Sequence, residues 1–235
     1  MTIWIGHRGY RDKHSENTFG AFDAAVEHGF QMIETDLRTT ADDHIILYHD
    51  PDLEKLGGSR HACIEQITRQ EAKKMRYACG GEPVFLDEFI NRYRSCRWVF
   101  DIKSRSGWQT LKVLKSRFDL SSIANNSIFL FDKFIHERTM RKIMPQAKFF
   151  ARKLECMVIG IAILFHLPVP RFLTSGKTFG VPPRLAGVPI YSASLVERFH
   201  RRGAKVIGYL PRDVADTRMA LDAGVDLILT DYSII

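Results

Sequence analysis

Two carboxylates, Glu34 and Asp36, end an apolar run, and histidine-containing blocks lie before and after them in the chain. Alternate residues of a strand share a face, so these two carboxylates are expected to lie side by side. Their mutual repulsion would raise the pKa of one of them unless a cation held them together. Oxygen ligands favour a hard cation, Mg²⁺ or Ca²⁺, over zinc. The pair therefore predicts a divalent metal site, with a structural salt bridge as the alternative when the pair is taken alone.

Two further blocks carry histidine at the end of an apolar run. Residues 5–9 are Ile-Gly-His-Arg-Gly, and residues 46–50 are Ile-Leu-Tyr-His-Asp. His7 and His49 follow apolar residues that share their strand faces. A barrel of parallel strands produces this pattern, because branched apolar side chains fill its interior and its carboxyl-end rim holds the active site. We expect two histidines and two carboxylates to meet at one rim.

Strand-like and helix-like segments alternate along the chain. Strands are expected at eight places, which are residues 3–7, 31–37, 44–48, 98–103, 127–131, 147–151, 205–209 and 226–230. Helices are expected at residues 19–26, 64–75, 86–93, 136–143, 195–202 and 214–222. This alternation predicts an α/β fold, a TIM-type (β/α)8 barrel.

Two stretches depart from simple alternation. Residues 39–43 are too few for a helix, so the strands that they join either pair antiparallel or turn sharply through the rim. Five prolines interrupt residues 154–190, where we expect a long excursion at the rim. The apolar run over residues 156–167 is shorter than the roughly 20 residues of a membrane-spanning helix. This run either packs against the barrel or forms an interfacial segment that contacts a membrane.

Length and composition favour one domain, residues 1–235, because α/β barrels of this length commonly do not divide and no linker is visible. The formal net charge is +7, but the basic residues are spread widely and aromatic residues do not interleave with them. We therefore expect no nucleic-acid partner. The four cysteines lie far apart, which argues against a zinc site or a disulfide framework. The N-terminus lacks the features of a secretory signal, so a cytoplasmic protein is expected.

The blocks occur in the order and at the spacing of a known family, the glycerophosphodiester phosphodiesterases. The signature that they resemble consists of His7-Arg8-Gly9, Glu16-Asn17-Thr18, Ala21-Phe22, Gly29, Glu34-x-Asp36 and His49-Asp50. Two later blocks are similar to the family's step into a helix and to its closing strand, namely Pro83-x-x-Leu86-x-Glu88 and residues 224–231. The resemblance runs from residue 3 to residue 231 and is weakest between residues 152 and 190.

The resemblance implies a TIM-type barrel that hydrolyses a glycerol phosphodiester, with His7 and His49 as general acid and base. A histidine pKa near 6.5 lets one imidazole accept a proton from a hydroxyl while a second donates one to the leaving alcohol. The implied nucleophile is often the substrate's own glycerol hydroxyl. Its attack gives a cyclic phosphate that water then opens.

The resemblance also implies the groups that surround the phosphate. Arg8 and Lys103 would provide positive partners for the phosphoryl oxygens. Glu34, Asp36 and Asp101 would bind the metal. Three supporting residues complete the expected site. Glu16 and Asn17 either cap the first helix or hold the rim, and Asp50 orients the neighbouring His49.

Departures from the family pattern bear on these expectations. Asp101 stands where the family usually has glutamate, and its shorter side chain would bind the metal directly or through water. Residues 209–213 replace a tryptophan and an asparagine near the end of a strand, which changes the fit of the substrate there. Ser15 replaces a common proline. The chain stops four residues after Asp231, which makes a homo-oligomer, with a partner covering part of the barrel, one expectation.

Three possible functions follow from these observations. The leading one is hydrolysis of small-molecule glycerophosphodiesters, which belongs to lipid and glycerol metabolism. The second is a lysophospholipase D activity on single-chain lipids, prompted by residues 156–167 beside a basic surface. The third is a non-catalytic barrel that binds phosphate esters or a protein, prompted by Asp101 and residues 209–213. The head group and the resident metal stay open.

Overall fold

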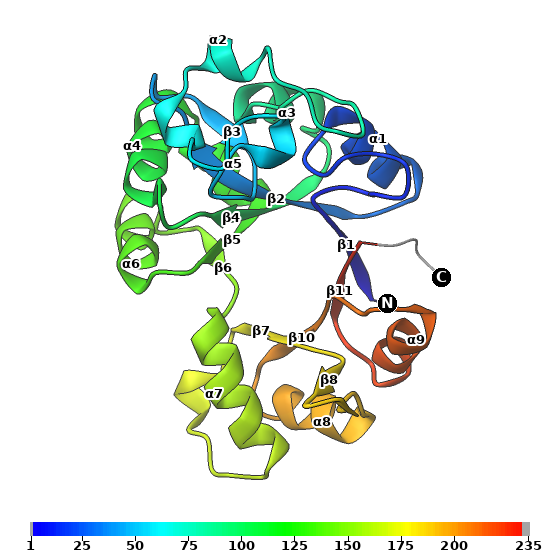
Figure 1. Ribbon diagram of the computed structural model, residues 1–235. Coiled ribbons are helices and arrows are strands. Elements are labelled where there is room, and N and C mark those ends of the chain that lie inside the picture. The colour runs from blue at the N-terminus through cyan, green and yellow to red at the C-terminus, as the bar shows by residue number, and fades with distance from the viewer. Residues whose placement is uncertain (1, 232–235) are drawn as a thin grey trace. The chain divides into compact units, whose positions relative to one another are not determined.

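The computed structural model describes residues 2–231, in which strands and helices alternate (Figure 1). These residues form two compact units. We call residues 6–148 the site unit, and residues 149–231 together with residues 2–5 the C-terminal unit. All the residues that the sequence predicts for the site lie in the site unit. Strand β1 (Ile3–His7) is divided between the two units.

The sheet of the site unit is parallel at its centre. Strand β2 (Met32–Thr39) pairs with β4 (Arg97–Ile102), and β4 pairs with β5 (Ser127–Phe131). The register of the first pair sets Asp36 opposite Asp101. Opposed residues on neighbouring strands lie side by side, so the sheet itself brings two acidic side chains together.

Strand β3 (Ile45–Leu47) pairs antiparallel with β2. The backbone N–H of Tyr48 then donates to the carbonyl oxygen of Asp36 at 3.0 Å. This bond holds the chain that leads to His49 against the end of β2. The expected strand over residues 44–48 therefore exists in the antiparallel alternative, and counting it among the parallel barrel strands was wrong.

Helices and short turns complete the site unit. Its helices are α1 (Phe19–Glu27), α2 (Arg69–Ala72), α3 (Leu86–Arg92), α4 (Gly107–Arg117), α5 (Leu120–Asn126) and α6 (Phe134–Ile143). The unit also contains two 3-10 turns, η1 (Glu54–Leu56) and η2 (Ile64–Gln66), and the boundary between the two units falls within strand β6 (Lys148–Phe149). Helix α1 begins at Thr18, whose hydroxyl accepts a hydrogen bond from Ala21 N. Fully buried aromatic side chains from α3, β4 and β5 form part of the core: Phe89, Trp98, Phe100 and Phe129.

The C-terminal unit contains a second parallel set of strands. β10 (Lys205–Tyr209) pairs in parallel with both β7 (Thr178–Val181) and β11 (Leu227–Thr230). Its other elements are α7 (Lys153–Leu164), η3 (Arg171–Leu173), β8 (Arg184–Leu185), β9 (Val188–Pro189), α8 (Ala193–His200) and α9 (Val214–Asp222). The side chains of Phe179 and Phe199 lie in ring contact between this sheet and α8.

Several expected elements were wrong or missed. The long excursion over residues 154–190 contains α7 and β7. Helix α7 is apolar on nearly every side, which conceals its helical period, and β7 is short and contains a glycine. Helices α4 and α5 were not expected at all, and the expected helix over residues 64–75 is divided into η2 and α2.

Candidate active site

The turn after β1 brings His7 and Arg8 to the acidic residues of β2. His7 Nε2 lies 3.9 Å from Glu34 Oε2. The backbone N–H of Arg8 donates to both the carbonyl oxygen and Oε2 of Glu34, at 3.0 and 3.1 Å. Gly9 has a φ of +90°, and a Cβ there would lie 2.6 Å from the backbone of Ala21. Glycine is therefore required where this turn passes α1.

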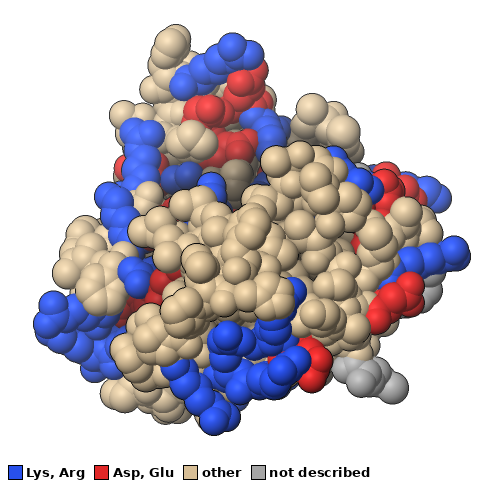
Figure 2. All heavy atoms as spheres, turned by 90° about the horizontal axis from the view of Figure 1, so that it is seen from below, with Lys and Arg blue, Asp and Glu red and all other residues tan. Residues whose placement is uncertain are grey.

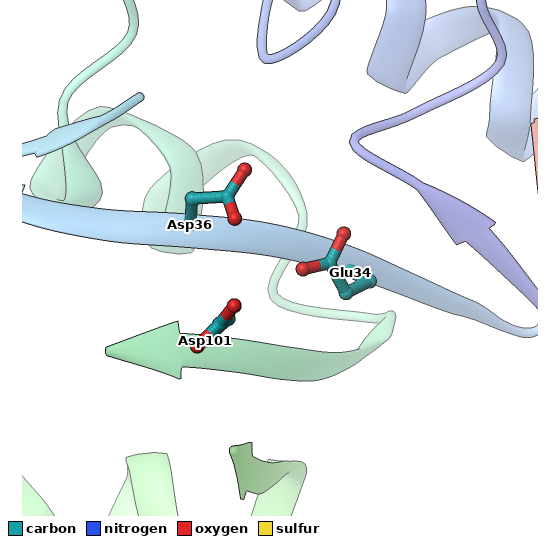
Figure 3. Close-up of side chains that lie close together, drawn as sticks. All are labelled: Glu34, Asp36 and Asp101. Atoms are coloured by element: carbon teal, nitrogen blue, oxygen red, sulfur yellow. The ribbon is translucent and has the colours of Figure 1, made fainter. Parts of the chain in front are cut away.

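Three buried carboxylates meet on β2 and β4 (Figure 3). Glu34, Asp36 and Asp101 each place one oxygen within 4.8 Å of the other two. Lys103 Nζ lies 2.8 Å from Asp36 Oδ1 and 2.6 Å from Asp101 Oδ2. Arg8 Nε lies 3.1 Å from the second oxygen of Asp36. The sequence-predicted metal ligands and phosphate-binding cations thus form one cluster.

Burial and charge act differently on the three carboxylates. Burial favours the neutral form of Asp36, but Lys103 and Arg8 outweigh it and hold the pKa of Asp36 below its usual range. Burial and the neighbouring Asp36 raise the pKa of Glu34 well above its usual range. Burial raises the pKa of Asp101 to about 6, although Lys103 opposes the rise. Two cations therefore do not fully compensate three buried carboxylates.

The donor set of this cluster fits a divalent cation. Oδ1 of Asp101 is buried and has no hydrogen-bond partner within the part of the chain that the structure describes. A buried carboxylate oxygen without a partner is costly, and a cation would satisfy it. Oxygen-only ligands suit a hard divalent ion. Glu34, Asp36 and Asp101 are the residues that would hold it.

His49 is oriented by a chain of ion pairs. His49 Nδ1 lies 2.6 Å from Asp50 Oδ1, and Lys55 Nζ lies 2.9 Å from the other oxygen of Asp50. Lys55 also binds Glu16 at 2.8 Å, and Glu16 binds Arg8 at 3.0 Å. Because Nδ1 of the imidazole contacts Asp50, Nε2 is the nitrogen left to face a substrate. Burial lowers the pKa of His49, against the opposing effects of Asp36 and Asp50.

Asn17 and Glu16 hold the site rather than capping α1, since Thr18 provides the cap. Asn17 adopts a left-handed backbone conformation with a φ of +56° and is fully buried. Its side-chain amide donates to Asp36 Oδ2 at 3.1 Å and its oxygen accepts a hydrogen bond from Thr35 at 2.7 Å. Asparagine tolerates this left-handed backbone conformation better than most residues. The conformation therefore allows its side chain to make these two hydrogen bonds.

Two cations of the site were missed from the sequence. Arg38 donates twice to the backbone oxygen of His49, at 3.2 and 2.8 Å, and also pairs with Glu65 at 3.1 Å. Lys55 links Asp50 to Glu16 as described above. Lys55 belongs to a 3-10 turn with no regular spacing to the motif blocks. For Arg38 a signal existed, because it lies two residues beyond Asp36 on the same strand face.

Comparison with known proteins places the chain in a family. The model of the glycerophosphoryl diester phosphodiesterase family matches residues 7–234. The chain belongs to this family. It is 26% identical to the probable glycerophosphodiester phosphodiesterase 2 of Mycobacterium tuberculosis, over 97% of this chain and 87% of that protein. It is also 39% identical to a lysophospholipase D of Homo sapiens, over 97% of this chain and 82% of that protein.

Solved structures of glycerophosphodiester phosphodiesterases share the fold. The phosphodiesterase domain of an uncharacterised Mycobacterium tuberculosis protein matches with a TM-score of 0.80 at 17% identity, over 98% of this chain and 96% of that one. A phosphodiesterase from Oleispira antarctica, solved in complex with the product sn-glycerol-3-phosphate, matches with a TM-score of 0.74 at 15% identity, over 99% and 94% of the two chains. The predicted α/β class and TIM-type (β/α)8 barrel are confirmed.

Proposed function

We propose that this phosphodiesterase hydrolyses glycerophosphodiesters to glycerol 3-phosphate and an alcohol, with His7 and His49 as its acid–base pair. The observation that carries the proposal is the cluster around Asp36, where Arg8, Lys103 and the other two carboxylates meet. Such a cluster combines positive partners for a phosphate with a cation site. The structure solved with sn-glycerol-3-phosphate supports the choice of product.

The imidazoles would move two protons in the first step. Neutral His49, whose pKa burial lowers, accepts the proton of the glycerol hydroxyl as that oxygen attacks phosphorus. His7, beside Glu34, donates a proton to the alcohol oxygen as its bond to phosphorus breaks. Water opens the resulting cyclic phosphate in the second step, with the proton transfers reversed.

The positive groups act on the phosphoryl oxygens. Arg8 presents a planar guanidinium and Lys103 a point charge, both fixed by Asp36 before the substrate arrives. Fixed charges stabilise the developing negative charge without reorganisation. A hard divalent ion, Mg²⁺ or Ca²⁺, held by Glu34, Asp36 and Asp101 would neutralise further charge there.

A second candidate is lysophospholipase D activity, in which the diester carries one acyl chain. The relative from Homo sapiens and the exposed apolar residues of α7 favour it. The same residues would perform the chemistry. Turnover of lysophosphatidylcholine at least as fast as that of glycerophosphocholine would establish this candidate, and turnover of the deacylated diester alone would remove it.

The test of the main proposal is release of glycerol 3-phosphate from glycerophosphocholine or glycerophosphoethanolamine by the purified chain. We expect turnover with Mg²⁺ or Ca²⁺ and a large loss of turnover after chelation. Absence of turnover with Mg²⁺, Mn²⁺ and Ca²⁺ on every diester would contradict the proposal. The expected cytoplasmic location, single domain, homo-oligomer and lack of a nucleic-acid partner stay predictions.

Lys55→Ala is expected to lower kcat about tenfold with a smaller change in KM, because Asp50 loses the cation that fixes it and His49 loses its orientation. Lys74, exposed on the same unit, provides the matched control as Lys74→Ala. Steady-state kinetics on a glycerophosphodiester measures both variants. Equal kcat values for the two variants would mean that this ion pair does not position the imidazole.

A further inference from the structure

Helix α7 carries an apolar stripe on its exposed face. Four residues of the helix, Leu154, Met157, Val158 and Ile161, and Phe165, which caps its C-terminal end, are each between 39% and 66% exposed. At 100° per residue these positions fall within an arc of about 100° of the helix. Ile163, on the opposite side of the helix, is fully buried within the C-terminal unit. The helix is therefore apolar on two faces, and only one of them is covered by the described chain.

The stripe belongs to a larger apolar patch. Its other members are in the chain that follows α7: Leu167, Phe172 and Leu173. We call these eight residues the α7 patch. They make up eight of the fifteen exposed large hydrophobic residues in the described part of the chain. A hollow of about 240 Å³ lies within the patch, lined by Leu154, Glu155, Val158, Ile159, Leu173 and Lys177. Scattered exposed apolar residues are ordinary, but such a concentration indicates an interaction surface.

Basic residues outnumber acidic ones in the segment that carries the patch. Residues 152–196 contain five basic side chains and a single acidic one, Glu155. Glu155 is neutralised within the unit, since Arg152 and Lys177 bind it at 3.1 and 2.8 Å. Lys153 and Arg171 are exposed, and each is the neighbour in the chain of a patch residue, Leu154 and Phe172. Figure 2 shows a broad uncharged field with Lys and Arg gathered along its left and lower edges, and with Asp and Glu among the groups at its upper and right edges.

Helix α8 adds a further cation at the end of α7. Arg198 Nη1 donates to the carbonyl oxygen of Leu164 at 3.4 Å. The last turn of α7 therefore has a guanidinium beside it, at the edge of the apolar stripe. An apolar face with basic neighbours complements a surface whose interior is apolar and whose outer layer carries anionic groups.

We propose that the α7 patch docks the C-terminal unit onto the surface of an anionic phospholipid bilayer. The stripe enters the boundary between head groups and acyl chains, while Lys153 and Arg171 meet lipid phosphates. Helix α7 has 12 residues and a length of about 18 Å, so it lies in the interface. In the described part of the chain, every helix falls short of the length and apolarity of a membrane span.

Charge distinguishes a bilayer from a second copy of this chain. In a symmetric dimer through the patch, Lys153 and Arg171 of one copy would lie near Lys153 and Arg171 of the other, and these like charges would repel. The acidic residue that could compensate, Glu155, is already paired. An anionic bilayer removes this repulsion and turns it into attraction. The proposal concerns the C-terminal unit alone and does not depend on the proposed chemistry of the site unit.

Vesicle flotation of the full chain tests the proposal with two matched variants. Val158 and Val214 are 55% and 56% exposed, but only Val158 belongs to the patch. We expect the wild type to float with vesicles of equal parts phosphatidylglycerol and phosphatidylcholine. Val158→Glu should lower the bound partition coefficient about tenfold, a change of about 1.4 kcal/mol, and Val214→Glu should leave it unchanged. Binding of the wild type should fall with added salt.

A second variant separates charge from apolar contact. Lys153→Gln with Arg171→Gln keeps the stripe and should reduce binding to the anionic vesicles more than to phosphatidylcholine alone. Circular dichroism and turnover of a water-soluble diester verify that each variant is folded. Failure of the wild type to float, or equal binding of Val158→Glu and Val214→Glu, would overturn the proposal. Loss of a dimer in Val158→Glu without vesicle binding by the wild type would assign the patch to a second copy instead.

Discussion

Replacing either His7 or His49 by alanine is expected to lower kcat toward a glycerophosphodiester by about 10²- to 10⁴-fold, the usual contribution of a general acid or base. His7 Nε2 lies 3.9 Å from Glu34 Oε2, and the charge of Asp36 acts on the imidazole of His49. When one imidazole is missing, water must carry out its proton transfer, and water is a poorer acid and base than an imidazole. The KM is expected to change less, because in the proposed function Arg8 and Lys103 would still bind the phosphate.

His61→Ala provides the matched control for these histidine variants. His61 is exposed and belongs to no contact of the site. Initial rates with saturating divalent ion, together with thermal unfolding of each variant, separate chemistry from stability. A folded His7→Ala or His49→Ala variant that retains the wild-type kcat would show that the imidazole is not part of the reaction. The double variant is expected to lose little beyond the stronger single one, since both groups serve one step.

Replacing Asp101 by asparagine is expected to remove most of the response to divalent ions. The wild type should lose activity by about 10³-fold on chelation, because an ion held by the three carboxylates would neutralise negative charge that develops on the phosphoryl oxygens. It should also gain stability on binding, by about 2.7 kcal/mol at an ion concentration of one hundred times Kd. Asp101→Asn replaces one oxygen of a carboxylate whose Oδ1 has no hydrogen-bond partner in the described part of the chain by an amide nitrogen, so both effects should shrink.

Thermal unfolding with and without Mg²⁺ or Ca²⁺ measures the ion independently of activity. Asp12→Asn, at an exposed position in the same unit, serves as the control for a lost carboxylate. Asp101→Glu restores the residue that the family usually has at this position and should keep the ion response. An ion-induced rise in Tm that is the same in Asp101→Asn and in the wild type would exclude Asp101 as a ligand.

The fold class could be predicted from the sequence because buried strands and amphipathic helices alternate over most of the chain. The individual strands were harder to assign. Residues 44–48 have the apolar pattern of a barrel strand, but the five-residue connection to β2 forces β3 to pair antiparallel. Residues 178–181 have little apolar length, and their place beside β10 depends on tertiary contacts.

The acidic cluster could be predicted because local spacing determines it. Glu34 and Asp36 are two residues apart on β2, and the parallel register with β4 adds Asp101. Lys55 could not be predicted, because its contact with Asp50 depends on a short turn whose path has no periodic signature. The apolar run over residues 156–167 was recognised, but the spacing of its apolar residues does not show which side of α7 is covered by the rest of the C-terminal unit.

Phosphorus NMR of glycerophosphocholine incubated with the wild-type chain and Mg²⁺ tests the central claim most directly, because it identifies which phosphorus–oxygen bond breaks. We expect the diester signal to be replaced by that of glycerol 3-phosphate, and His7→Ala and His49→Ala to leave the diester intact over the same time. Appearance of phosphocholine, or an unchanged diester with every divalent ion, would contradict it.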